Sequence, residues 1–412
     1  MRERRRWTVH DLRRGNRSVL LSSLFFEEPR SRQQLSEATG LSPASVSNVL
    51  RDLIDQGIVV EVDSVDSDGG RPRALLQVSS DYGYIIGVDV SETRVRVELF
   101  DLTMAGRART DYPLDPGQHG VGLIVEAILT GLEAVLADSG VSPAAVLGIG
   151  IGIPGIVESG PDSLVHGQAF GWASVPLERL LRAGTDLPLY IENGVKAMGQ
   201  AEMWFGAGRG AQNVVACLIG SGVGASIIAN GVALRGATSS AGEWGHTTVM
   251  VDGRACRCGS FGCLEAYVGA EAILDQYGSR LPGSDQEAEL TALIGLASTS
   301  ARAAEILDTT ALYLGSSIAD LINLFNPQRI ILGGWAGLLL GEYMLPTIRA
   351  VACERSLRHL FAQTSIGLGR LGPDAVALGA AALPIKALLS GNAFPTREAT
   401  SPPAQHGAAR AG

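Results

Sequence analysis

The N-terminal part of the chain carries hydrophobic and polar positions in the pattern of short helices. Apolar side chains recur at helical spacing over residues 17–27 (RSVLLSSLFFE), and residues 31–39 predict a second, shorter helix. Gly40 marks a tight turn, after which Ser42 provides an N-cap for a third helix that ends near Gln56. Helices joined by a tight glycine turn in this way are typical of a helix-turn-helix unit.

Two strand-like segments follow the third predicted helix. The segment IVVEV predicts a strand, the polar segment DSVDSDGGRPR predicts a loop, and ALLQV predicts the returning strand. We therefore expect a two-stranded wing whose tip presents Arg71 and Arg73. A rigid, cationic Gly-Arg-Pro turn has a shape suited to a phosphate backbone or to a narrow minor groove.

The third predicted helix has an apolar face for the core and a polar face for solvent. The polar face could contact base edges and phosphates, and it is formed by Ser45, Ser47, Asn48 and Arg51. A small helical unit of this kind can instead serve for dimerisation or for binding a peptide. The helix-turn-helix, the wing and a basic N-terminal arm together favour DNA.

Charge is unevenly distributed along the chain, whose net charge is −9. Residues 1–75 hold twelve arginines and eleven acidic residues, a net charge of +1 that leaves −10 for the remainder. Residues 1–20 alone hold seven arginines against two acidic residues, a basic arm that suits phosphate contact, although a solvated tail has the same composition. The acidic remainder would be repelled by nucleic acid, which confines any DNA contact to the N-terminal part.

From Tyr82 onward the sequence is rich in glycine and alternates between strand and helix patterns. The segments YIIGVDV and VRVELFDL predict a β-hairpin, residues 121–138 an amphipathic helix, and SGVGAS a glycine loop. Strands interleaved with helices over this length predict an α/β fold of two lobes with a cleft between them. We expect an N-terminal domain over residues 1–78, an α/β domain over residues 82–391 and a disordered tail over residues 392–412.

The composition is that of a soluble protein. The chain has 46% hydrophobic and 18% charged residues, and its apolar runs are too short to cross a bilayer. Its five cysteines are an odd number, and the arginine-rich start lacks an apolar signal segment. We therefore expect a cytoplasmic protein without membrane segments or structural disulfides.

The segment AGEWGHTTVMVDGRACRCGSFGCLEAY brings one histidine and three cysteines together. Zinc favours four tetrahedral ligands drawn from thiolate sulfur and imidazole nitrogen, and this set completes such a shell without a position for water. One alternative is that these are unligated core cysteines, an assignment that suits Cys217 and Cys353 better than the cluster. Disulfides are the other alternative, and they also explain the cluster less well. We expect one structural Zn2+ per chain, bound by His246, Cys256, Cys258 and Cys263.

Several segments of the chain match sequence motifs of one known protein family. They are GRP in the wing, GIGIPGIVE, GWASVPLERLL, YIEN, AEMWFGAGRGA, IGSGVGASIIANGVALRGA, AGEWGH, CRCGSFGCLEAY and NLFNPQRIILGG. Together they resemble the ROK family (repressors, open reading frames and sugar kinases) over nearly the whole chain. The cysteine segment is highly specific to that family, whereas the glycine loops alone are not. The resemblance implies an actin-like, ribonuclease-H-like fold of two lobes that bind a sugar between them, usually in a homodimer, here preceded by a winged helix-turn-helix.

The resemblance also implies which residues contact the sugar. They are Glu243, His246, Glu265, Asn193 and the backbone of Gly155. Carboxylates accept hydrogen bonds from hydroxyl groups and an asparagine both donates and accepts, so a few such groups can distinguish epimers. His246 would bind zinc through one ring nitrogen and sugar through the other. For Glu243 and Glu265 the alternative is helix capping or an ion pair.

Two departures from the kinases of this family bear on activity. Where those kinases carry Asp-x-Gly-Gly-Thr at the first phosphate loop, this chain has Asp89-Val90-Ser91-Glu92-Thr93. Ser91 replaces a glycine whose backbone approaches phosphates, and Glu92 adds negative charge near anions. Gly194 replaces the aspartate that removes the proton from the sugar hydroxyl, and losing a general base costs a factor of about 10² to 10⁴ in rate. We therefore expect no kinase activity.

The leading hypothesis is a sugar-responsive transcriptional regulator, in the first place a repressor, of genes for carbohydrate uptake or catabolism. A dimer or tetramer would place two third helices in major grooves about 34 Å apart on a palindromic operator. A sugar or sugar phosphate would change the spacing of these DNA-binding units. The second hypothesis is an active ATP-dependent sugar kinase with an appended DNA-binding domain. The third is a regulator with a protein effector and a vestigial pocket.

Overall fold

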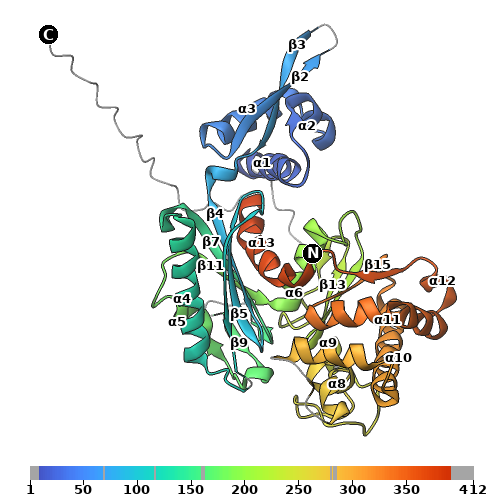
Figure 1. Cartoon of the computed structure of the whole chain (residues 1–412). Coiled ribbons are helices and arrows are strands. Elements are labelled where there is room, and N and C mark those ends of the chain that lie inside the picture. Colours follow the sequence, from blue (N-terminus) through green and yellow to red (C-terminus); the bar gives the residue numbers. More distant parts are fainter. Residues whose placement is uncertain are drawn as a thin grey trace, which may run out of the picture.

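Figure 1 shows the computed structural model, in which an N-terminal head stands on two α/β lobes. The structure describes residues 9–67, 70–115, 117–158, 163–278, 281 and 285–390, without the side chains of residues 9–10, 63–67 and 70–72. The predicted basic arm before Val9, the turn at the tip of the wing and the predicted tail over residues 392–412 lie outside the described residues.

The head consists of helices packed on a small sheet of strand order β1-β3-β2. Its first helix begins at Val9, not at residue 17 as predicted, because the added residues are mostly polar and carry no apolar periodicity. The second and third helices lie within one residue of the predicted bounds, and Ser31 caps the second helix instead of belonging to it. The elements are α1 (Val9–Phe26), β1 (Arg30–Ser31), α2 (Arg32–Thr39), α3 (Pro43–Asp55), β2 (Val59–Ser67) and β3 (Gly70–Val78).

Serine caps determine where α2 and α3 begin. The Ser31 hydroxyl accepts a hydrogen bond from the Gln34 N–H at 3.3 Å, and Gln34 Oε1 accepts one from the Ser31 N–H at 2.8 Å, which forms a capping box. Ser42 accepts a hydrogen bond from the Ser45 N–H at 3.2 Å, with Pro43 at the first helical position. These bonds satisfy backbone donors that each helix start would otherwise leave unpaired.

The wing is longer than predicted, because most of the predicted loop is strand. The predicted tip residues Arg71 and Arg73 lie within β3, so their assignment to a turn was wrong. The register of the β2–β3 pair shifts between Val65 and Ser67, opposite Pro72. Proline has no N–H to donate to a ladder, so it is tolerated where the pairing is irregular.

The first lobe is built on a mixed sheet of strand order β11-β7-β4-β5-β6, with α4 and α13 on opposite faces (Figure 1). The β4–β5 hairpin is as predicted. Strand β6 was not predicted, because its sequence GRARTDYP is polar and its residues are exposed or half-buried. The elements are β4 (Tyr84–Val90), β5 (Arg94–Asp101), β6 (Gly106–Pro113), α4 (Val121–Ser139), β7 (Val146–Ile153), β8 (Ile156–Val157), β9 (Leu164–His166), β10 (Val175–Pro176), α5 (Leu177–Leu181) and β11 (Leu189–Asn193).

The second lobe is built on a sheet of strand order β14-β13-β12-β15-β16. Most of the segment SGVGAS, predicted as a loop, belongs to strand β13. The segment has small residues because it packs closely on α6. A Cβ on Gly224 would meet Val195 Cγ2 at 3.0 Å. The elements are β12 (Val214–Ile219), β13 (Val223–Ala229), β14 (Val232–Ala233), α7 (Glu265–Val268), α8 (Ala270–Tyr277), α9 (Gln286–Leu296), α10 (Ala301–Phe325), β15 (Arg329–Gly333), α11 (Trp335–Arg355), α12 (Arg358–Phe361) and β16 (Ser365–Leu368).

The central helices α6 (Gly194–Phe205) and α13 (Ala375–Leu389) connect the lobes. A Cβ on Gly150 of β7 would lie 1.8 Å from the Ala380 carbonyl oxygen of α13. A Cβ on Gly379 of α13 would lie 1.9 Å from the Ala197 carbonyl oxygen of α6. Glycine is therefore required at both positions, because any side chain would push the backbones apart.

The head and the first lobe share one hydrophobic cluster. Leu20 and Leu50 of the head, Phe100 of β5 and Leu388 at the end of α13 all belong to it. Because this cluster is continuous, the head is packed on the lobes instead of being tethered by a free linker.

The window Gly372–Leu389, which contains α13, is long and apolar enough to cross a membrane by length and composition alone. In the structure, 61% of this window is buried inside the molecule. It packs on β4, β7 and α6, which are the contacts of a core helix.

We expect Gly150→Ala to destabilise the protein by about 1–3 kcal/mol or more, because the added methyl group overpacks the contact with α13. Thermal unfolding followed by circular dichroism measures the change. Gly367→Ala in β16 is the matched control, because a Cβ there has nothing within 4 Å, and it should change stability by less than about 0.5 kcal/mol. Equal unfolding midpoints for Gly150→Ala and the wild type would contradict the close packing.

Candidate functional site

A cavity of about 520 Å³ lies between the two lobes. Its volume falls in the range of about 300–1,000 Å³ that is usual for small-molecule sites. The first lobe contributes the turns after β4 and β7, α6 contributes its first residues, and the second lobe contributes the glycine loop before β13 and parts of the cysteine segment. The predicted sugar contacts all line this cavity: Gly155, Asn193, Glu243, His246 and Glu265.

Asn193 is held by hydrogen bonds at both ends of its amide. Its Oδ1 accepts from the N–H groups of Val195 and Lys196 at 3.0 and 3.2 Å, which caps α6. Its Nδ2 donates to the Gly155 carbonyl oxygen at 2.7 Å. Gly155 has a φ of 94°, and a Cβ there would lie 2.2 Å from the His166 carbonyl oxygen. The amide of Asn193 therefore keeps one N–H for a ligand in the cavity.

Glu243 faces the cavity with a carboxylate that has no hydrogen-bonded partner within the described part of the chain. The surrounding protein excludes bulk water, and this burial raises the pKa of Glu243, while His246 and Lys196 act in the opposite direction. A carboxylate with open acceptor positions in a sheltered cavity is suited to receive hydroxyl groups.

Glu265 already has one partner for each carboxylate oxygen. Its Oε2 accepts from the Val223 N–H at 2.9 Å, and its Oε1 accepts from Arg257 Nε at 2.8 Å. Glu265 therefore forms the ion pair that was the alternative to sugar contact, and it also lines the cavity. Each oxygen has a second lone pair, so Glu265 can still accept a bond from a ligand.

Arg257 was not among the predicted site residues, although its charge between Cys256 and Cys258 was a signal in the sequence. Its Nη1 donates to Glu92 Oε2 at 2.6 Å, so the guanidinium joins Glu92 of the first lobe to Glu265 of the second. Burial alone would lower the pKa of Arg257, but hydrogen bonds and charge from the two carboxylates outweigh it and raise the pKa. The charge of Glu92, expected to repel anions directly, is thus paired.

The β4–β5 turn is closed on itself by Ser91. The Ser91 hydroxyl accepts from the N–H groups of Thr93 and Arg94 at 3.4 and 3.2 Å. In a phosphate-binding loop such N–H groups point at the ligand, whereas here a side chain occupies them. Asp89 lies buried at the same wall of the cavity, and burial raises its pKa to about 6, while Arg94 acts in the opposite direction.

Gly194 lies at the start of α6 and lines the cavity without a side chain that could remove a proton. Space for a side chain exists, because a Cβ there would make an ordinary contact of 3.5 Å with Val376 Cγ1. The neighbouring Glu192 does not line the cavity, and its Oε2 accepts from Arg235 Nη2 at 2.5 Å. Glu192 therefore does not take the place of the missing base.

The predicted metal ligands converge at one point beside the cavity. The ligand atoms of His246, Cys256, Cys258 and Cys263 all lie within 4.8 Å of one another. The sulfur atoms of Cys258 and Cys263 are 3.7 Å apart, and Cys256 Sγ is 3.7 Å from His246 Nδ1. A tetrahedron with metal–sulfur distances of about 2.3 Å has edges of about 3.8 Å, so these separations fit one metal ion.

The three thiols lie close enough to influence one another's protonation. Burial and the neighbouring Cys258 and Cys256 raise the pKa of the Cys263 thiol to about 12. A dication would favour the thiolate forms and relieve this crowding of donors. Nδ1 of His246 faces the cysteines, so its other ring nitrogen, Nε2, is not needed for the cluster. His246 also lines the cavity.

The predicted DNA contacts of the third helix lie on α3. Asn48 and Arg51 are exposed, and Ser45 and Ser47 are half-buried. The Ser45 hydroxyl lies 3.0 Å from the Ser42 hydroxyl, so part of its hydrogen-bonding capacity serves the helix cap. The exposed pair Asn48 and Arg51 is therefore the most accessible to a partner.

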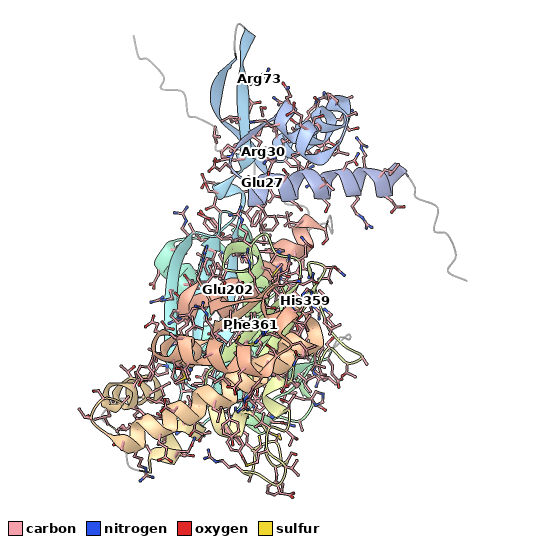
Figure 2. The ribbon with its side chains drawn as sticks, turned by 90° about the vertical axis from the view of Figure 1, so that its right-hand side faces the viewer. Glu27, Arg30, Arg73, Glu202, His359 and Phe361 are labelled. Atoms are coloured by element: carbon pink, nitrogen blue, oxygen red, sulfur yellow. The ribbon has the colours of Figure 1, made fainter. Side chains whose placement is uncertain are left out.

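The wing carries the other predicted DNA contacts. Figure 2 shows Arg73 on the wing, on the far side of the head from the lobes, and its side chain is exposed. The side chain of Arg71 lies outside the described ones. Helix α1 also contacts the C-terminal end of α3, where Arg17 Nη2 donates to Oε1 of the C-cap residue Gln56 at 2.8 Å.

Known proteins are similar to this chain over most of its length, including both the head and the lobes. A xylose repressor from Caldicellulosiruptor bescii is 31% identical, over 92% of this chain and 97% of that protein. A solved structure of a ROK family transcriptional regulator, a homologue of the E. coli MLC protein, is similar with a TM-score of 0.77 at 26% identity, over 92% of this chain and 98% of that chain.

A glucokinase from Halalkalibacterium halodurans is 34% identical, over 72% of this chain and 93% of the kinase. The two regulators thus match more of this chain than that kinase does. The predicted fold, two actin-like α/β lobes preceded by a winged helix-turn-helix, is confirmed by the likeness to the solved regulator. The sequence model of the ROK family matches residues 85–387, and the protein belongs to the ROK family.

Proposed function

We propose that the protein is a sugar-responsive transcriptional repressor that binds operator DNA through α3 and the wing. The observation that carries this proposal is that one packed molecule holds both a helix-turn-helix head and a cavity into which carboxylates, an asparagine and a histidine converge. The likeness to a xylose repressor over 92% of the chain supports it. Exposed Asn48, Arg51 and Arg73 would contact DNA, together with Ser45, Ser47 and Arg71.

Helix α6 provides a route from the cavity to the head. Its first residue follows Asn193 at the cavity, and its last residues are Trp204 and Phe205. The Trp204 ring lies 4.9 Å from the Phe26 ring and 6.4 Å from the Phe25 ring, measured between centroids, at the end of α1. Because α1 packs on α3, a sugar that shifts α6 would move the DNA-binding helix.

The cavity would hold the sugar through Glu243, Glu265, His246 and the remaining N–H of Asn193, with Gly155 positioning Asn193. These groups offer both donors and acceptors, which a sugar needs at successive hydroxyl groups. Zinc would be held by His246, Cys256, Cys258 and Cys263 as a closed structural shell. Through His246, the ion would fix one wall of the cavity.

The second hypothesis, an active sugar kinase, is not supported by the cavity. Ser91 occupies the N–H groups of its own turn, and the Arg257–Glu92 pair lies against Gly222 of the glycine loop. Gly194 supplies no general base. An assay of ADP release with common hexoses, pentoses and amino sugars discriminates the two hypotheses, since turnover at ordinary enzyme rates would contradict a regulator without activity.

We expect the full-length protein to bind a DNA duplex that it selects from random sequence, and to release it when the matching sugar is added. The coupling should lower operator affinity by about 5- to 150-fold, measured by fluorescence anisotropy. The selected duplex should be palindromic with half-sites about one helical turn apart, because a dimer presents two α3 helices. Unchanged operator affinity across neutral and phosphorylated sugars would contradict sugar response and favour a protein effector.

We expect Cys258→Ser to abolish zinc binding and to lower the unfolding temperature, because three ligands do not complete the shell. Elemental analysis should give about one zinc ion per wild-type chain. Cys353→Ser is the control, because Cys353 is exposed and outside the cluster. Wild-type metal content and melting in Cys258→Ser would refute the assignment.

We expect Trp204→Ala to weaken the response of the operator to sugar, because it removes the shortest aromatic contact between α6 and α1 and leaves only the longer contacts of Phe205. The release of operator by sugar should shrink to less than about threefold, whereas wild-type coupling is about 5-fold or more. Tyr343→Ala on α11 is the control, because Tyr343 is 47% exposed and away from this contact. A full sugar response in folded Trp204→Ala would exclude this route.

A further inference from the structure

Arg257 occupies the end of the cavity at which the two lobes come together. It donates to Glu92 Oε2 at 2.6 Å and to Glu265 Oε1 at 2.8 Å, so its charge is shared by a carboxylate from each lobe. Glu265 and Glu92 are nearly buried, with side-chain exposures of 8% and 15%, and Arg257 is 29% exposed. Charge-assisted bonds in such a sheltered place are among the stronger polar contacts in a protein.

The glycine loop before β13 backs directly onto this group. A Cβ on Gly222 would lie 3.1 Å from Arg257 Nη2, 3.5 Å from Glu265 Oε2 and 3.6 Å from Glu92 Oε1. The loop and the β4–β5 turn are the two places from which backbone N–H groups could approach a phosphate. In the turn, the Ser91 hydroxyl occupies N–H groups, and at the end of the loop the Val223 N–H donates to Glu265 while Arg257 lies against Gly222.

The charge lining the cavity is unfavourable for an anion. Among the described residues, the wall carries four carboxyl groups, Asp89, Glu92, Glu243 and Glu265, and two guanidinium groups, Arg94 and Arg257. Arg257 is already paired with two of the carboxylates. A phosphate ester would therefore find more negative than positive groups at short range.

From this arrangement we propose that Arg257 and Glu92 select an uncharged sugar as the effector and exclude its phosphate esters. This inference rests on the proposed function. A phosphate that bound Arg257 through Nη2 would lie beside the carboxylates of Glu92 and Glu265, which repel it. A phosphate that took the Nη1 position would displace Glu92 and leave that carboxylate unpaired in a nearly buried position. Breaking a buried pair in this way is costly, because one charge loses its partner without regaining water. An uncharged sugar needs no such exchange, since Glu243 and the remaining N–H of Asn193 already face the cavity.

The experiment measures one quantity, the ratio of the dissociation constant of a phosphate ester to that of its parent sugar. Calorimetric titration of the full-length protein with glucose, xylose and N-acetylglucosamine, and with the phosphate monoesters of each, gives this ratio. In the wild type the ester should bind at least about 100-fold more weakly than the sugar that binds best. In Glu92→Ala the ratio should fall by at least about tenfold, because Arg257 Nη1 loses its carboxylate partner and can form a charge-assisted bond with phosphate, while Nε stays bonded to Glu265.

Glu92→Gln is the second variant, and it should shift the ratio in the same direction by a smaller factor because it keeps the shape of the side chain. Glu305→Gln is the matched control, because Glu305 is exposed on α10 and does not line the cavity, and it removes the same charge. Its ratio should equal that of the wild type. An equal shift in this control would assign the effect to net charge and overturn the proposal.

Two further outcomes separate this inference from the function on which it rests. If a phosphate ester binds the wild type as tightly as its parent sugar and releases the operator, the selection by Arg257 and Glu92 is wrong, whereas the sugar-responsive repressor stands. If neither sugars nor esters bind, the proposed function fails and this inference fails with it. A ratio that is unchanged in both folded Glu92 variants also overturns the selection.

Discussion

The backbone contact of α13 with its neighbours is the constraint on which the rest of the structure depends. Gly150 and Gly87 of the first sheet face carbonyl oxygens of α13, and Gly379 of α13 faces a carbonyl oxygen of α6. Because no side chains separate these elements at the glycines, the backbones of the first sheet, α13 and α6 are in direct contact and form one closely packed unit. The same helix ends among the leucines of the head, so one element connects the lobe, the cavity wall and the DNA-binding helices.

The cavity combines groups that suit sugar hydroxyls with groups that disfavour phosphates. Asn193 and Glu243 present a donor and acceptors, and His246, which lies in one cluster with three cysteines, lines the same cavity. In the same cavity, Arg257 holds a carboxylate from each lobe beside the glycine loop that precedes β13. The same two lobes can therefore belong to a regulator or to a kinase, since function resides in the site and not in the fold.

Local features of this protein were predictable from its sequence, and contacts between distant segments were not. Ser31 and Ser42 cap helices because their neighbours along the chain supply the donors, and the cysteines converge because glycines allow tight turns between them. Strand β6 was missed because its polar residues carry little apolar pattern. The bridge from Glu92 to Arg257 joins residues far apart in sequence, so only the fold shows that the repelling charge is paired.

The central claim is that sugar binding and operator binding are coupled through one packed molecule. Coupling between two ligands is reciprocal, so the operator must change sugar affinity by the same factor as the sugar changes operator affinity. Calorimetric titration of the sugar into the free protein and into its operator complex measures this directly. We expect weaker sugar binding to the operator complex than to the free protein, by the factor found for operator release. Equal sugar affinity with and without operator would contradict it.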